Sequence, residues 1–146
     1  MKKYVPDISQ HAALCAANYV RLERLLQDLS EAQYQFSWQD NGGHQIDVDI
    51  HVTERFKYTT TLQLLKQAHA IPAPMDRVEL TVRMYSDARL AEVVGISQGQ
   101  QLAGVYRYPN EQMYQIDEKQ QVNRYLAEWL GHLLTHGSVR GLWTPK

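Results

Sequence analysis

The spacing of the apolar residues changes along the chain, and this change limits the folds that the chain can adopt. Between residues 34 and 64 apolar side chains recur at every second position, beginning with Tyr34, Phe36 and Trp38. That period is typical of a strand that buries one face. Towards both ends of the chain they recur every three or four residues, as in an amphipathic helix. Because strands and helices are grouped instead of alternating, the sequence predicts an α+β fold.

Three consecutive antiparallel strands are predicted in the first half of the chain. The first is followed by Asp40-Asn41-Gly42-Gly43, a hairpin pattern, because Asn and Gly tolerate positive φ. The apolar residues of the second strand are Ile46, Val48, Ile50 and Val52. Those on one side of the third are Phe56, Tyr58, Thr60, Leu62 and Leu64.

The strand pattern resumes after an interruption by Pro72 and Pro74, which lack backbone donors. The fourth strand carries Val78, Leu80, Val82 and Met84 on one face. Residues 87–94 fit either a strand or a helical turn, and we favour a strand. A turn is expected at residues 97–101, followed by a last strand at residues 102–108.

A helix is predicted at each end of the sequence. The first runs from a cap at Ser9 to about Leu29. The second begins at a capping-box pattern formed by Asp117 and Gln120, and Gly137 occupies the position that follows its last turn. The apolar stripe of the first is Cys15, Tyr19, Leu22, Leu25, Leu26 and Leu29. That of the second is Val122, Tyr125, Leu126, Trp129, Leu130, Leu133 and Leu134. We therefore expect an antiparallel sheet of five to six strands with both helices packed on one face.

The whole chain is expected to form a single domain, because no linker or repeat divides its 146 residues. Within it, residues 1–8 form an N-terminal arm and residues 138–146 a C-terminal tail. The tail contains Leu142 and Trp143, which either pack locally or contact a partner.

Charge and cysteine content exclude several classes of protein. Fifteen Lys and Arg nearly balance sixteen Asp and Glu, and a pI of about 6.6 does not favour nucleic-acid binding. Cys15 is the only cysteine, so neither an internal disulfide nor a cysteine-based zinc knuckle can form. No signal peptide or apolar run long enough for a membrane is found. We expect a cytoplasmic protein that does not enter a membrane.

Two groups of residues have the spacing of metal ligands. Asp47, Asp49 and His51 alternate along one strand, so their side chains would share a face. His132 and His136 are four apart on the last helix, close enough to reach one zinc ion. The simpler interpretation is a polar strand face in the first case and a helix-dipole contact in the second. The sequence therefore predicts no cofactor.

The densest group of polar and aromatic residues lies between residues 83 and 119. Arg and Tyr are the residues that binding surfaces favour, although a solvated strand face with weak ion pairs would look the same. The candidate residues for binding a ligand or partner are Arg83, Tyr85, Asp87, Arg89, Tyr106, Arg107, Tyr108, Asn110, Glu118 and Lys119.

An ordered series of short motifs is similar to a known family. The motifs are Lys57-Tyr58-Thr59-Thr60, the run from Val82 to Ala88, Tyr106-Arg107-Tyr108-Pro109-Asn110, Asp117-Glu118-Lys119 and the helix from Leu126 to Gly137. Together they resemble the YqiB-like family of small bacterial proteins, a family of unknown function. The resemblance implies no catalytic residue or cofactor. It implies that the group between residues 83 and 119 is a family signature, whereas the row of Asp47, Asp49 and His51 is not.

These observations favour a non-enzymatic binding or adaptor protein. It would hold a protein segment or a small ligand on its polar and aromatic sheet face, or in a groove beside the last helix. One alternative is a small metal-assisted hydrolase or transferase, with Asp87, Glu118 or the histidines as acid–base groups. Another is a self-associating subunit that resembles small chaperones, so an oligomer remains open.

Overall fold

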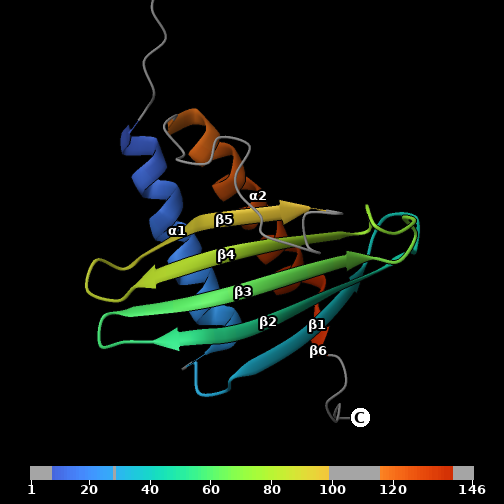
Figure 1. The fold of residues 1–146 in the computed structure, drawn as a ribbon, viewed down its shortest axis with the longest axis horizontal. Helices are drawn as coiled ribbons and strands as arrows, with labels where there is room; N and C mark the ends of the chain where they lie inside the picture. The colour runs from blue at the N-terminus through green and yellow to red at the C-terminus, as the bar shows by residue number, and fades with distance from the viewer. Residues whose placement is uncertain (1–7, 28, 99–115, 140–146) are drawn as a thin grey trace, which may run out of the picture.

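A computed structural model describes residues 8–27, 29–98 and 116–139 of the chain. Its elements, in chain order, are α1 (Ile8–Leu26), β1 (Gln33–Gln39), β2 (Gln45–Arg55), β3 (Thr59–Ala68), β4 (Arg77–Tyr85), β5 (Leu90–Gln98), α2 (Ile116–His136) and β6 (Ser138–Val139). Both helices lie behind the same face of the sheet (Figure 1). The predicted α+β architecture, with an antiparallel sheet and a helix from each end of the sequence, is confirmed.

The described strands form one sheet in the order β5-β4-β3-β2-β1-β6. Strands β1 to β5 pair with their neighbours in the chain as an antiparallel meander. The β1–β2 turn forms where the Asn-Gly pattern predicts it, with Gly43 at a φ of 80°. The side chain of Asp40 accepts hydrogen bonds from the backbone N–H groups of His44 and Gly42, and these bonds lower the pKa of its carboxyl.

The sixth described strand has a different origin from the one expected. Residues 102–108, predicted as the last strand, lie outside the described residues. Strand β6 instead consists of the first two residues of the predicted tail, and it pairs Val139 with Phe36 of β1. Gly137 alone separates β6 from α2, and a Cβ atom there would lie 2.5 Å from the carbonyl oxygen of Leu133. The tight exit from the helix therefore requires glycine.

Two strand predictions were wrong at their ends. Phe56 and Tyr58, expected in the third strand, lie in the β2–β3 turn and are 65% and 52% exposed. A hydrogen bond from Phe56 N–H to Thr59 O closes this turn. The prediction was wrong because the alternation of apolar residues continues through the turn. Strand β5 continues through Ser97 and Gln98, where a turn was expected; residues 99–101 are not described.

Residues 87–94 contain a turn and then a strand. Arg89 has a φ of 55°, and β5 begins at Leu90. The pairing of β4 with β5 shifts register after Thr81, so that Val94 has no opposite residue. This bulge explains why the apolar residues of the segment do not separate cleanly into two faces.

Helix α1 begins at Ile8, one residue before the predicted cap, and ends at Leu26, earlier than expected. Gln27 and Leu29 have positive φ values, which end the helix. Helix α2 likewise begins one residue before Asp117, at Ile116. Leu134, expected on its apolar stripe, is 40% exposed.

The hydrophobic core lies between the sheet and the two helices. Its largest fully buried side chain is that of Trp129, and the other large side chains that are fully buried are leucines, isoleucine and valines from strands β2 to β5 and both helices. Cys15 of α1 is also buried. Burial raises the pKa of its thiol to about 11 and lowers the pKa of His11 one turn earlier.

Two buried asparagines join the elements around this core. Asn123 of α2 accepts a hydrogen bond from Val93 N–H of the edge strand β5, and its own amide donates to Lys119 O. Asn18 of α1 donates to Asn123 O. Both asparagines are fully buried, so polar groups tie α1, α2 and β5 together inside the molecule.

Candidate functional site

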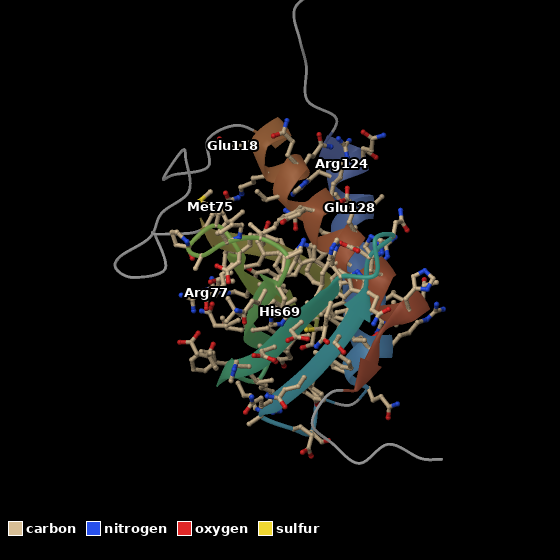
Figure 2. The ribbon with its side chains drawn as sticks, turned by 90° about the vertical axis from the view of Figure 1, so that its right-hand side faces the viewer. His69, Met75, Arg77, Glu118, Arg124 and Glu128 are labelled. Carbon is tan, nitrogen blue, oxygen red and sulfur yellow. The ribbon has the colours of Figure 1, made fainter. Side chains whose placement is uncertain are left out.

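The described residues surround a pocket of about 790 Å³ between α2 and the β1–β2 hairpin. Its walls come from the second half of α2, the end of β1, the start of β2 and Lys66 of β3. Glu128 marks the α2 wall in Figure 2. This volume is typical of pockets that bind small organic molecules.

Aromatic rings form much of the wall. The rings of Trp38 and His132 are stacked with their centroids 5.4 Å apart and only 6° between their planes. Tyr125 and Trp129 meet edge to face at 5.3 Å. Trp38 reaches the pocket because the period of β1 turns it towards the helices, and the other three rings lie on one stripe of α2.

Lys66 supplies a positive charge to this aromatic wall. It follows Leu62 and Leu64 on the helix-facing side of β3. Its Nζ atom lies 5.2 Å from the ring centre of Tyr125 and 5.4 Å from that of Trp129, and 3.4 Å from Tyr125 Oη. Within the described ranges no carboxylate forms an ion pair with Lys66. Lys66 thus places a positive charge at the pocket, in contact with the rings of Tyr125 and Trp129.

The histidines predicted as metal ligands on α2 both line this pocket. In the described part of the chain, however, Glu128, His132 and His136 do not bring three ligand atoms within 4.8 Å of one another. His132 instead stacks on Trp38.

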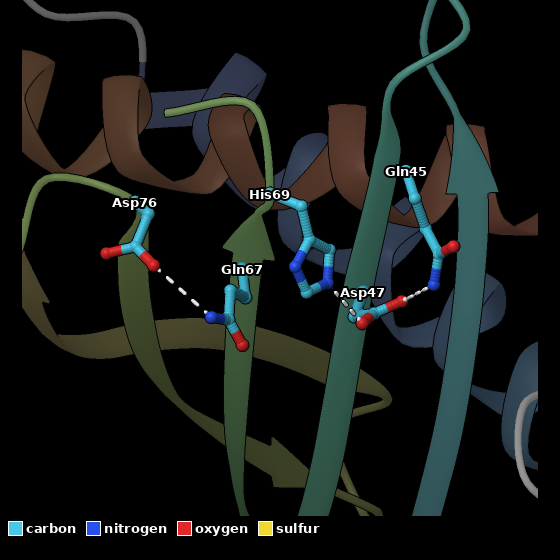
Figure 3. Close-up of polar contacts among 5 residues, drawn as sticks. All are labelled: Gln45, Asp47, Gln67, His69 and Asp76. Carbon is cyan, nitrogen blue, oxygen red and sulfur yellow. Dashed lines mark hydrogen bonds and ion pairs between the residues drawn. The ribbon is translucent and has the colours of Figure 1, made fainter. Parts of the chain in front are cut away.

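The row of Asp47, Asp49 and His51 lies on the sheet face away from the helices. Asp47 contacts His69 of the β3–β4 loop, with 2.6 Å between Asp47 Oδ2 and His69 Nε2 (Figure 3). Gln45 donates to the other oxygen of Asp47 at 2.8 Å. Of the residues that the structure describes, these three do not form a cluster of metal ligands.

The polar and aromatic candidates are divided between two sides of the sheet. Arg83 and Tyr85 lie on the face opposite Val82 and Met84, which enter the core. Glu118 and Lys119 lie at the start of α2, where Figure 2 shows Glu118. The candidates that lie outside the described residues are Tyr106, Arg107, Tyr108 and Asn110.

Asp87 and Arg89 lie in the exposed β4–β5 turn. Asp87 accepts a hydrogen bond from Ala88 N–H. Arg89 forms an ion pair with Glu23 of α1 at 3.2 Å and lies over the ring of Tyr19 at 5.2 Å. This arginine therefore attaches the turn to α1.

Sequence reasoning did not identify Lys66, Trp38 and Tyr125 as parts of a site. The pattern did contain an indication, because Lys66 continues the row of Leu62 and Leu64 on the face that enters the core. A charged residue in an apolar row is rare unless it has a partner or a function.

Comparison with known proteins identifies the family. A model of a family described as "Protein of unknown function (DUF1249)" matches residues 21–139. The chain is 35% identical over 140 residues to the uncharacterised protein YqiB of Escherichia coli K12, covering 95% of this chain and 96% of the relative. The YqiB proteins of the O6:H1 and O157:H7 strains match equally. No solved structure was found to match. The chain belongs to the DUF1249 family, and the resemblance to YqiB is confirmed.

No described helix has both the length and the apolarity that crossing a membrane requires.

Proposed function

We propose that this member of the DUF1249 family is a cytoplasmic binding protein whose ligand occupies the pocket between α2 and the β1–β2 hairpin. The observation that carries the proposal is the position of Lys66, a cation against the rings of Tyr125 and Trp129 in a pocket of about 790 Å³. The cytoplasmic location is inferred from the single cysteine.

The chemistry of the walls favours a small ligand with a flat ring and an anionic group. His132, which stacks on the buried Trp38, and Tyr125, which meets the buried Trp129, offer ring surfaces, on which planar molecules pack well. Lys66 has three donors and no described carboxylate partner, so it can bind a carboxylate or phosphate. His132 and His136 would add donors at the same pocket.

The test is a thermal-shift screen of the full chain against small aromatic carboxylates and phosphates, followed by titration of the compounds that stabilise it. We expect at least one such compound to raise the melting temperature. Its affinity should fall about 10-fold or more in Lys66→Met, because a charge-assisted hydrogen bond is lost.

Lys57→Met is the matched control, because it removes the same charge from a residue in the exposed β2–β3 turn. Its affinity for the compound should equal that of the wild type. Equal binding by wild type and Lys66→Met, or no stabilisation by any anionic aromatic compound, would contradict the proposal.

A further inference from the structure

Three metal-ligating side chains meet on the other side of the core, between α1 and β5. They are His11, Cys15 and Glu92, and one ligand atom from each lies within 4.8 Å of the others. His11 and Cys15 are four residues apart on α1, so they share one face of the helix. Glu92 comes from the strand against which α1 packs. None of these residues lines the pocket described above.

The separation of the two helix ligands fits a single tetrahedral ion. Cys15 Sγ lies 3.6 Å from His11 Nε2. With Zn–S and Zn–N bonds of about 2.3 and 2.0–2.1 Å, tetrahedral angles place the two ligand atoms about 3.6 Å apart. An ion could therefore bind both atoms without a change in the helix.

The imidazole of His11 also has unused capacity. Its Nδ1 atom is buried and has no hydrogen-bond partner among the described residues. The other ring nitrogen, Nε2, is the one that faces Cys15 Sγ. An ion bound at Nε2 leaves Nδ1 as the protonated nitrogen, a donor that a water molecule or another acceptor outside the metal ligands would take. The proposed ligand atom of His11 is therefore Nε2.

We propose that His11, Cys15 and Glu92 bind one Zn²⁺ ion, with the fourth coordination position taken by a water molecule. A mixed set of thiolate sulfur, imidazole nitrogen and carboxylate oxygen is a zinc set, and three protein ligands leave one position open. As the Zn–S bond forms, the thiol of Cys15 releases its proton to the solvent. The site would fasten α1 to β5.

The test is titration of the metal-free full chain with Co²⁺, which replaces zinc and reports its ligands spectroscopically. We expect one equivalent to produce a thiolate-to-cobalt charge-transfer band and the visible bands of tetrahedral cobalt, and added Zn²⁺ to remove both. Because Cys15 is the only cysteine, the thiolate band can come from no other residue. Its absence from the wild type would overturn the proposal without any variant.

Variants then test the other two ligands. His11→Gln and Glu92→Gln should each weaken cobalt binding by more than about 100-fold, beyond the 10–100-fold effect of changes outside the first coordination sphere. Cys15→Ser should lose the thiolate band, while its circular dichroism stays that of the wild type. His51→Gln is the control for loss of a histidine and should bind as the wild type does. Unchanged affinity in His11→Gln or Glu92→Gln would overturn the three-ligand site.

Discussion

Glu79 shows how a single residue on the sheet can oppose folding. Its carboxyl lies on β4, opposite Leu65 of β3 and Ser97 of β5. Burial raises the pKa of this carboxyl, and the charge of His51 only partly opposes the shift. Since the folded-state pKa lies above the ordinary value, the folded state disfavours the ionised form. The resulting loss of stability is complete above the folded-state pKa and disappears as the pH falls below the ordinary value.

We therefore predict that Glu79→Gln increases the free energy of unfolding at pH 7. The increase should shrink to nothing near pH 3.5, below the ordinary pKa of about 4.3 for glutamate. Urea unfolding at both pH values measures the difference. Glu31→Gln, at an exposed residue, is the control and should change stability at neither pH. A Glu79→Gln protein less stable than the wild type at pH 7 would contradict the prediction.

At the scale of the elements, hydrogen bonds to Asn123 connect parts that the sheet alone does not hold. Strand β5 is the end strand of the described sheet, so Val93 N–H has no neighbouring strand and donates to Asn123 Oδ1 instead. The same residue receives a hydrogen bond from Asn18 of α1. Asn123 thus links β5 through its side chain and α1 through its backbone carbonyl, and both helices are held against the edge of the sheet.

We predict that Asn123→Ala lowers the free energy of unfolding by about 1–3 kcal/mol for each buried group left without a partner. The reason is that Val93 N–H would remain buried without its acceptor, and Lys119 O would lose the amide donor of the side chain. The bond from Asn18 is kept, because its acceptor is the backbone carbonyl of Asn123. Arg124→Ala, at the neighbouring exposed residue of α2, should change it by less than about 0.5 kcal/mol. Equilibrium unfolding in urea distinguishes the two, and equal effects would show that the asparagine contacts carry no special weight.

The elements were predictable where the apolar period was regular, and the errors fall where it misleads. Strands β1 and β4, and β2 as far as Val52, follow a regular period of two. The alternation of Phe56 and Tyr58 continues into a turn, and the bulge opposite Thr81 disrupts it in β5. Helix ends depend on backbone conformation at residues such as Gln27, which no periodicity reports.

The molecule as a whole is stabilised by one layer of side chains between the sheet and the helices. Leu64, at the centre of β3, is fully buried there. The same layer explains why neither candidate site could be predicted in full. His11 and Cys15 share a helix face in the sequence, but Glu92 joins them only because α1 packs on β5. Lys66 likewise meets Trp129 only after β3 and α2 pack together.

A pair of identical substitutions tests the position of this layer. We predict that Leu64→Ala lowers the free energy of unfolding by about 2–5 kcal/mol, because it leaves a cavity in a fully buried site. Leu134→Ala removes the same atoms from a side chain that is 40% exposed, and it should cost less than about 1 kcal/mol. Chemical denaturation of the two proteins gives the comparison. A larger loss for Leu134→Ala would place that leucine in the core.

The passage from α2 through Gly137 to β6 has a mechanical consequence. Because β6 is hydrogen-bonded to β1, the end of α2 is fastened to the strand that carries Trp38, and the two main walls of the pocket share an anchor. The helix cannot slide lengthwise along the sheet without breaking that attachment. Under the proposed function, a ligand would therefore meet walls that are already joined, and little of its binding free energy would be spent on bringing them together.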